Sequence, residues 1–348
     1  MKKKSIVAAI SALSLIVSMN IGIGSVFAGE QNTVPGTAEQ PFVVTDGLFD
    51  QTKTESDLGL SKIEGAETVT VFTATDDTDH YCNGVVMTEF KGKLYTQWQS
   101  SAKDEDAEDT WVAYSVSDDN GATWSEPKVL VPTIDNGYCS SGGWFVSGDT
   151  LVSYINVWYS DTTPRGGFAY YVESTDGEHW SEMKPVLMKD GTPMEGIIEQ
   201  DPHVLASGRI VNAAHFQPGL FAYPIYTDDP SGTKGWVKTQ YTCMEQGEGA
   251  TTSREMEPSL FVNEDGTIVM TFRDQKSSFV RLAAISTDQG KTWSETVSTN
   301  MPDCRAKQSA GNLPDGTAYL VGCSVNNKGR WPLTITLSSD GKTFDTAY

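Results

Sequence analysis

The sequence of 348 residues is poor in cysteine, histidine and positive charge. It contains five cysteines and four histidines, and its 25 lysines and arginines are outnumbered by 46 aspartates and glutamates, so the formal net charge is -21. A strongly acidic chain repels nucleic acids and anionic membranes, which excludes both as partners. Five scattered cysteines do not make a disulfide framework, and their odd number leaves at least one thiol outside any intrachain pair. The cysteines and histidines also lack zinc-ligand spacing, so we expect no metal and no cofactor.

Long apolar segments are lacking after the first 28 residues. The chain begins Met1-Lys2-Lys3-Lys4, continues with an apolar run to Ile23, and reaches small residues ending at Ala28. A basic start, an apolar middle and a small-residue exit are typical of a secretory signal peptide. The apolar run is shorter than the roughly 20 residues of a membrane span. The sequence therefore predicts a signal peptide at residues 1–28, cleaved after Ala28, and a secreted, extracellular protein without membrane insertion.

One eight-residue pattern recurs along the chain. Residues 117–124 and 286–293 both read S-x-D-x-G-x-T-W, shorter variants occupy 174–180 and 338–344, and a degraded copy lies at 226–236, so the copies are about 55 residues apart. In such a pattern the aspartate can bond to nearby backbone amides, the glycine takes a positive φ, and the tryptophan packs under the turn. We interpret the copies, including His179 in one of them, as structural hairpin turns. The acidic run 104–109 is typical of a solvated loop.

The segments around each copy predict β-strands. Residues 110–116 and 280–285 alternate apolar and polar side chains, and residues 88–95 and 260–272 read as strand, glycine turn and strand. Four strands per repeat indicate a propeller blade, and no segment shows helical periodicity. We predict an all-β fold, a six- or seven-bladed β-propeller with four-stranded antiparallel blades over residues 66–348, after an N-terminal extension at 29–65.

The end of the sequence is unusual for a propeller. Tyr348 follows directly after the fifth copy of the pattern, before any outer strand of that blade. We expect the last blade to be incomplete, either completed by residues 66–74 or left open because the chain is truncated at its C-terminus.

Several motifs resemble a known superfamily. The repeated pattern, with Glu257-Pro258-Ser259, Asp265-Gly266-Thr267 and Arg273-Asp274, resembles the sialidase-like (Asp-box, BNR repeat) propellers over nearly all of the chain after the signal peptide. Within that superfamily the chain is similar to the α-L-rhamnosidases and L-rhamnose-glucuronate lyases; the similar stretches are 80–98, 199–202, 226–236, 312–316 and 330–333. The Arg-Ile-Pro motif of true sialidases is absent, and no tyrosine stands out as the nucleophile that those enzymes use.

Polar residues near the starts of the predicted blades are the candidate site residues. The innermost strand of each blade lines the centre of a propeller, and charged groups there are costly to bury unless they meet a ligand or each other. Glutamate and histidine can transfer protons, and the planar arginine fork suits a carboxylate. The resemblance places a histidine at the position of His80. The candidate catalytic residues are His80, Glu199 and Glu257. The candidate substrate-binding residues are Arg273, Arg330, Arg254, His203, His215 and Trp98.

The sequence leaves three functions open. The resemblance implies a monomeric, exo-acting glycoside hydrolase that cleaves a terminal sugar from an anionic glycan, with two carboxylates as acid and base or as nucleophile. A polysaccharide lyase acting at a rhamnose-glucuronate linkage, with His80 or a tyrosine as base, is the first alternative. A non-catalytic carbohydrate-binding propeller, in which Glu257 and Arg273 form a structural ion pair, is the second. Of the aromatic residues outside the repeats, we expect one or two at the mouth of the site; they are Trp98, Trp144, Trp158, Tyr159 and Tyr170.

Overall fold

The computed structural model describes residues 34–75, 77–244 and 246–348. The predicted signal peptide lies outside these ranges. The described chain is built from β-strands, with a single turn of 3-10 helix, η1 (Gln51–Lys53). In these ranges no helix has the length and apolar character needed to cross a membrane. The prediction of an all-β fold is confirmed.

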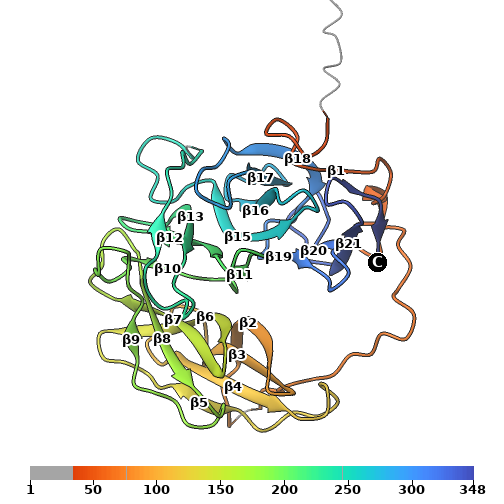
Figure 1. Ribbon diagram of the computed structural model, residues 1–348. Coiled ribbons are helices and arrows are strands. Elements are labelled where there is room, and N and C mark those ends of the chain that lie inside the picture. The colour runs from red at the N-terminus through yellow and green to blue at the C-terminus, as the bar shows by residue number, and fades with distance from the viewer. Residues whose placement is uncertain (1–33, 76, 245) are drawn as a thin grey trace, which may run out of the picture. The chain divides into compact units, whose positions relative to one another are not determined.

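Five antiparallel sheets follow one another along the chain, arranged around a common centre (Figure 1). The first sheet contains β2 (Tyr81–Phe90), β3 (Lys93–Ser101), β4 (Trp111–Ser117) and β5 (Lys128–Val131). The second contains β6 (Gly137–Ser147), β7 (Thr150–Tyr159), β8 (Phe168–Ser174) and β9 (Lys184–Pro185). The third contains β10 (Gly196–Ile197), β11 (His203–Val204), β12 (Ile210–Phe216), β13 (Phe221–Thr227) and β14 (Val237–Lys238).

The fourth and fifth sheets repeat the same order. The fourth contains β15 (Glu255–Val262), β16 (Ile268–Asp274), β17 (Val280–Ser286) and β18 (Val297–Pro302). The fifth contains β19 (Ser309–Asn312), β20 (Ala318–Gly322), β21 (Thr334–Ser338) and β23 (Thr346–Ala347). Sequential antiparallel pairing of four strands, repeated about a centre, is the architecture of a β-propeller.

The number of blades differs from the expectation. The described chain has five blades, so the prediction of six or seven is wrong. The fifth blade is also complete, because β23 pairs with β21 as its outermost strand, and the expected incomplete last blade is not observed. Residues 66–74 form no strand; instead β1 (Val43–Val44) pairs in parallel with β22 (Thr343–Phe344). The N-terminal chain therefore does join the last blade, but about 25 residues earlier than predicted.

The repeated turn pattern braces the outer part of each sheet as its sequence predicts. The Asp119 carboxylate accepts bonds from the Thr123 amide at 2.8 Å and hydroxyl at 2.6 Å, and these bonds hold the pKa of Asp119 at about 2. Gly121 has φ 88°, and the Trp124 indole donates to its carbonyl at 3.1 Å. His179 likewise bonds to Asp176 of its own turn, at 2.8 Å. These residues are structural.

Apolar cores lie between neighbouring sheets. Trp144 and Leu151 of the second sheet pack against Tyr95 and Tyr114 of the first, and equivalent clusters join the second to the third sheet and the third to the fourth. Between the fourth and fifth sheets the core also contains the N-terminal residue Phe42. Because the apolar side chains are used between the sheets, polar ones can be placed at the centre.

The first strand of four sheets is irregular at the same level. Residue pairing shifts by one between Asn83 and Val86 in β2, between Ser141 and Trp144 in β6, and between Met256 and Ser259 in β15. In the third sheet the corresponding strand is split into β10 and β11 by residues 198–202. A β-bulge redirects side chains and often lies beside a functional site.

Candidate active site

A central cavity of about 590 Å³ collects residues from the first four sheets and from the connections that flank the strands of the fifth. The irregular first strands lead into it, because each contributes a lining residue at or beside its bulge. These residues are Asn83, Gly84, Ser140, Ser141, Ile197, Glu199, Met256 and Glu257. The bulges thus turn the centre of the propeller into a polar site.

Two carboxylates meet one histidine at this site. His215, on β12, is buried, with 1% of its side chain exposed. Its Nδ1 lies 3.2 Å from Oε2 of Glu199, and its Nε2 accepts a bond from the Glu257 amide at 3.2 Å. Burial lowers the pKa of His215 to about 4, so its ring is neutral near pH 7. A neutral ring that accepts at Nε2 carries its proton on Nδ1, facing Glu199.

Glu257 has an unusual backbone. It lies in the bulge of β15 with φ 50°, a region that residues other than glycine rarely adopt. Strain of this kind concentrates at functional sites. The neighbouring acid Glu255 faces elsewhere: its Oε1 accepts from the Met244 amide at 2.8 Å, and it does not line the cavity. The bulge therefore separates a structural glutamate from one that faces the cavity.

The Glu257 side chain forms an ion pair with Arg273 of β16, with 3.1 Å between Oε2 and Nε. Burial raises the pKa of Glu257, and so does the nearby charge of Glu199, while Arg273 and Lys307 oppose the rise. The contacts of Glu257 with Arg273 and of Glu199 with His215 are close but not aligned as hydrogen bonds. Buried polar atoms without hydrogen bonds are uncommon and call for an explanation, and a functional site is one.

Positive charge gathers on the side of the cavity formed by the fourth and fifth sheets. Gln275 accepts from Arg273 at 3.1 Å and from Arg305 at 3.0 Å, so one amide oxygen holds two guanidinium groups together. Lys307 and Arg330 line the same side of the cavity. Four cations close together create a local positive potential in a chain of net charge -21.

The opposite side of the cavity is formed by the first two sheets. Arg165 forms an ion pair with Asp106 at 2.5 Å and lies over the Trp158 ring, 4.7 Å from its centroid. Tyr138 stacks on the same tryptophan and donates to Asp106 at 2.8 Å. Aromatic rings beside polar groups suit the apolar face and hydroxyls of a sugar. Trp158 thus lies at the cavity, as expected of one or two of the aromatic residues.

Five of the predicted site residues come together at this cavity. Glu199, Glu257, Arg273 and Arg330 line it, and His215 contacts both glutamates from behind. His80 is exposed just before β2 and does not line the cavity. Side chains alternate along a strand, so Tyr81, which does line it, faces the site while its neighbour does not.

Three further predicted residues lie away from the cavity. Arg254 is occupied by the buried Asp274, with bonds of 3.0 and 2.5 Å. Burial raises the pKa of Asp274, but its bonds with Arg254, Ser278 and the Lys276 amide outweigh this and lower it. Trp98 is buried and stacks on Phe72. The third is His203, which lines a second cavity.

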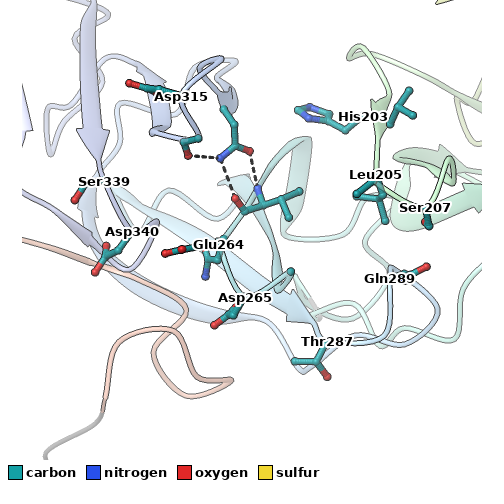
Figure 2. A pocket seen from close by; sticks show the side chains of 17 residues that line it. His203, Leu205, Ser207, Glu264, Asp265, Thr287, Gln289, Asp315, Ser339 and Asp340 are labelled. Atoms are coloured by element: carbon teal, nitrogen blue, oxygen red, sulfur yellow. Dashed lines mark hydrogen bonds between the residues drawn. The ribbon is translucent and has the colours of Figure 1, made fainter.

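The second cavity, of about 880 Å³, lies where the turns of the third, fourth and fifth sheets meet (Figure 2). Its carboxylates already serve their own turns, since Asp265 accepts from the Thr267 amide and Asp340 from the Thr343 amide. Asn312 bridges two backbone segments, with bonds to Val262 of 2.8 and 2.9 Å and to the Gly316 carbonyl of 3.0 Å. This cavity is explained by turn structure, and we do not assign the active site to it.

Sequence reasoning missed several lining residues. Lys307 lines the cavity, and Arg305 bonds to the lining residue Gln275; both lie in the irregular segment between β18 and β19, where no pattern marks them. Asp106 and Glu105 belong to the acidic run that we interpreted as solvated, yet both line the cavity. Within the described residues no group of histidine, cysteine and acidic side chains is placed to hold a metal ion.

Comparisons with known proteins agree with this architecture. Residues 92–348, more than half of the chain, match the family model described as a BNR repeat-like domain. No protein with a curated description is similar enough in sequence to match.

Solved structures with the same fold are distant in sequence. A protein of unknown function from Dyadobacter fermentans has a TM-score of 0.62 at 14% identity, with 80% of this chain and 84% of that chain covered. The intramolecular trans-sialidase of Ruminococcus gnavus has 0.58 at 15%, with 80% and 87% covered. The NanB sialidase of Streptococcus pneumoniae has 0.57 at 15%, with 77% of this chain and 60% of that chain covered. At these identities the likeness establishes the fold.

Proposed function

The chain belongs to the BNR repeat-like domain family, and from this premise we propose that it is a secreted glycoside hydrolase that removes a terminal sugar from an anionic glycan. The observation that carries the proposal is the central cavity, where Glu199 and Glu257 converge at His215 and face a cluster of cations. The solved trans-sialidase and sialidase on this fold support the choice of a glycan as substrate class.

Glu257 and Glu199 supply the pair of carboxyl groups that glycoside hydrolysis needs. Burial raises the pKa of Glu257, which favours a protonated carboxyl that can donate to the leaving oxygen. Glu199 then serves as the base that activates water or as the nucleophile. The neutral His215 is a positioning residue, because its Nε2 fixes the Glu257 backbone while its Nδ1 lies 3.2 Å from the Glu199 carboxylate.

The cations beside Glu257 bind the charged part of the substrate. A guanidinium group binds a carboxylate through two parallel hydrogen bonds, and Arg273 and Arg305 are held side by side by Gln275. Trp158 and Tyr138 provide an aromatic face at the opposite wall. A terminal uronate or another acidic sugar fits both walls.

The proposal is tested by incubating the purified protein with sialylated, uronate-capped and neutral glycans. We expect a free acidic sugar to be released from one anionic glycan and none from the neutral ones. Ultraviolet absorbance of an unsaturated uronate would instead identify a lyase. Binding without any product would identify a carbohydrate-binding propeller.

A matched pair of variants separates chemistry from folding. Glu257→Gln removes the carboxyl that we assign as acid, whereas Glu264→Gln removes an exposed carboxyl at the second cavity. We expect the first variant to abolish release and the second to leave it unchanged. Equal activity of both variants would overturn the assignment of Glu257.

A further inference from the structure

Two buried cysteines lie side by side in the fifth sheet. Cys304 precedes β19 and Cys323 follows β20, and the two residues are 2% and 8% exposed. The Cys304 amide donates to the Cys323 carbonyl at 3.2 Å, just beyond the ladder of β19 and β20, in which Ser309 pairs with Val321. The two thiols are close enough to shift each other's pKa, which is raised at Cys304 and lowered at Cys323.

This arrangement brings the two cysteines within reach of each other. A backbone hydrogen bond of 3.2 Å joins Cys304 directly to Cys323, and both side chains belong to the same buried cluster between the fourth and fifth sheets. A disulfide joins residues whose Cα atoms are roughly 4.4–6.8 Å apart, so it requires neighbouring backbones such as these.

The other three cysteines have different surroundings. Cys139 is buried between the first two sheets, Cys82 is exposed, and the Cys243 thiol donates to the Ala222 carbonyl. Within the described part of the chain, only Cys304 and Cys323 have a pKa shifted mainly by a neighbouring cysteine thiol.

We propose that Cys304 and Cys323 form an intrachain disulfide when the protein folds in contact with a disulfide oxidant. The Cys323 thiolate attacks one sulfur of the oxidant, and the first thiolate of the oxidant leaves. The Cys304 thiol then loses its proton and attacks the Cys323 sulfur, and the second thiolate leaves. Two electrons and two protons pass from the protein thiols to the oxidant, which becomes two thiols.

The local charges favour Cys323 as the attacking group. The hydrogen bond from Cys304 lowers the pKa of Cys323 to about 7; burial and Asp303 oppose this, and the positive charges of Arg281 and Arg330 assist it. Arg281 is fully buried and lies 3.8 Å from Asp303, so its charge is fixed beside the pair. A thiolate near neutral pH is the form that exchanges with a disulfide.

The bond would also anchor part of the cavity. Arg305 and Lys307 follow Cys304 directly, so fastening Cys304 to β20 limits the movement of both cations. This consequence rests on the proposed function, whereas formation of the bond does not.

The test is oxidative refolding with a mixture of reduced and oxidised glutathione, followed by alkylation of free thiols and tryptic mapping. Cleavage after Lys291, Arg305, Lys307 and Lys328 places the two cysteines in separate peptides, residues 292–305 and 308–328. We expect these peptides to be joined by a reducible link, with three free thiols remaining. Alkylation of both Cys304 and Cys323 as free thiols would overturn the proposal, and so would pairing of either with another cysteine.

Variants give the matched control. Cys304→Ser and Cys323→Ser should each lose the link, while Cys139→Ser should retain it, although Cys139 is equally buried. Closing the loop between Cys304 and Cys323 should raise Tm by about 5 °C relative to the reduced protein. The Cys304→Ser/Cys323→Ser double variant should show no such response to oxidant. If the disulfide forms but KM for the glycan is the same in reduced and oxidised protein, the proposal that the bond anchors the cations is wrong, whereas the proposal of the bond itself stands.

Discussion

Replacing His215 with glutamine should make the stability of the protein less dependent on pH. The native ring is 1% exposed and has a pKa of about 4, against 6.5 for a free histidine, because burial disfavours its charged form. In the unfolded chain this histidine therefore binds a proton below pH 6.5, whereas in the native protein it stays neutral down to about pH 4. The stability from the neutral ring is complete above pH 6.5 and is lost as the pH falls through this window.

The size of the effect follows from the two pKa values. Each unit of pKa difference corresponds to about 1.4 kcal/mol of unfolding free energy. Between pH 6.5 and pH 4 the protein therefore loses about 3 kcal/mol of stability, of which about 2 kcal/mol is lost by pH 5. The glutamine in His215→Gln keeps an acceptor for the Glu257 amide, but its side chain does not titrate. We expect the variant to be less stable than the wild type at pH 7, and the gap to shrink by about 2 kcal/mol at pH 5.

Urea unfolding followed by tryptophan fluorescence at pH 7, 6 and 5 measures this gap. Glu257 acts in the opposite direction, since its raised pKa favours the native state as the pH falls, but it is present in both proteins. His179→Gln is the control: its ring is exposed and Asp176 raises its pKa, so its removal should not flatten the profile. A gap between wild type and His215→Gln that stays constant from pH 7 to 5 would refute the reasoning.

Three further changes test other parts of the structure. Glu199→Gln should lower kcat by about 10²- to 10⁴-fold in a glycan-release assay with little change in Tm, because general acid–base catalysis contributes about that much and Glu199 has no cation pair to break; a loss below tenfold would remove Glu199 from the mechanism. Arg330→Ala should raise KM for an anionic glycan without lowering kcat, since Arg330 is exposed at the cavity and bonds only to the Arg305 carbonyl among the described residues; unchanged KM at low ionic strength would contradict its binding role. Tyr154→Phe should cost about 0.5–1.5 kcal/mol in urea unfolding, because it removes the 2.7 Å bond from the buried hydroxyl to the Gly232 carbonyl, while the Trp236 indole still donates to that carbonyl at 2.8 Å; a cost above about 3 kcal/mol would show that the Trp236 bond fails together with the Tyr154 bond.

The blades could be predicted from the sequence because their signals are local. The Asp119 turn closes within five residues, and the strands that flank it alternate in the usual way. The number of blades could not be predicted from such local signals. Five copies of the pattern were visible, and the expected additional blades came from an argument about closure rather than from residues.

The site was predictable only where a residue lies on a regular strand. Arg273 on β16 and His215 on β12 were identified with Glu257 because each sits in a recognisable segment. Lys307 lies in an irregular connection, and its position depends on packing between the fourth and fifth sheets. His80, just before β2, does not line the cavity, whereas the next residue, Tyr81, does.

The bulges of the first strands allow the lining of the cavity to change in one blade without changes in the others. The bulges carry residues that line the cavity, while the apolar clusters between the sheets are formed mainly by other residues of the blades. A substitution at Asn83 or Met256, which line the cavity and belong to none of these clusters, can change what the cavity recognises without disturbing an intersheet core. One scaffold can therefore acquire new specificities one blade at a time, and directed evolution of this protein should begin with libraries at those positions.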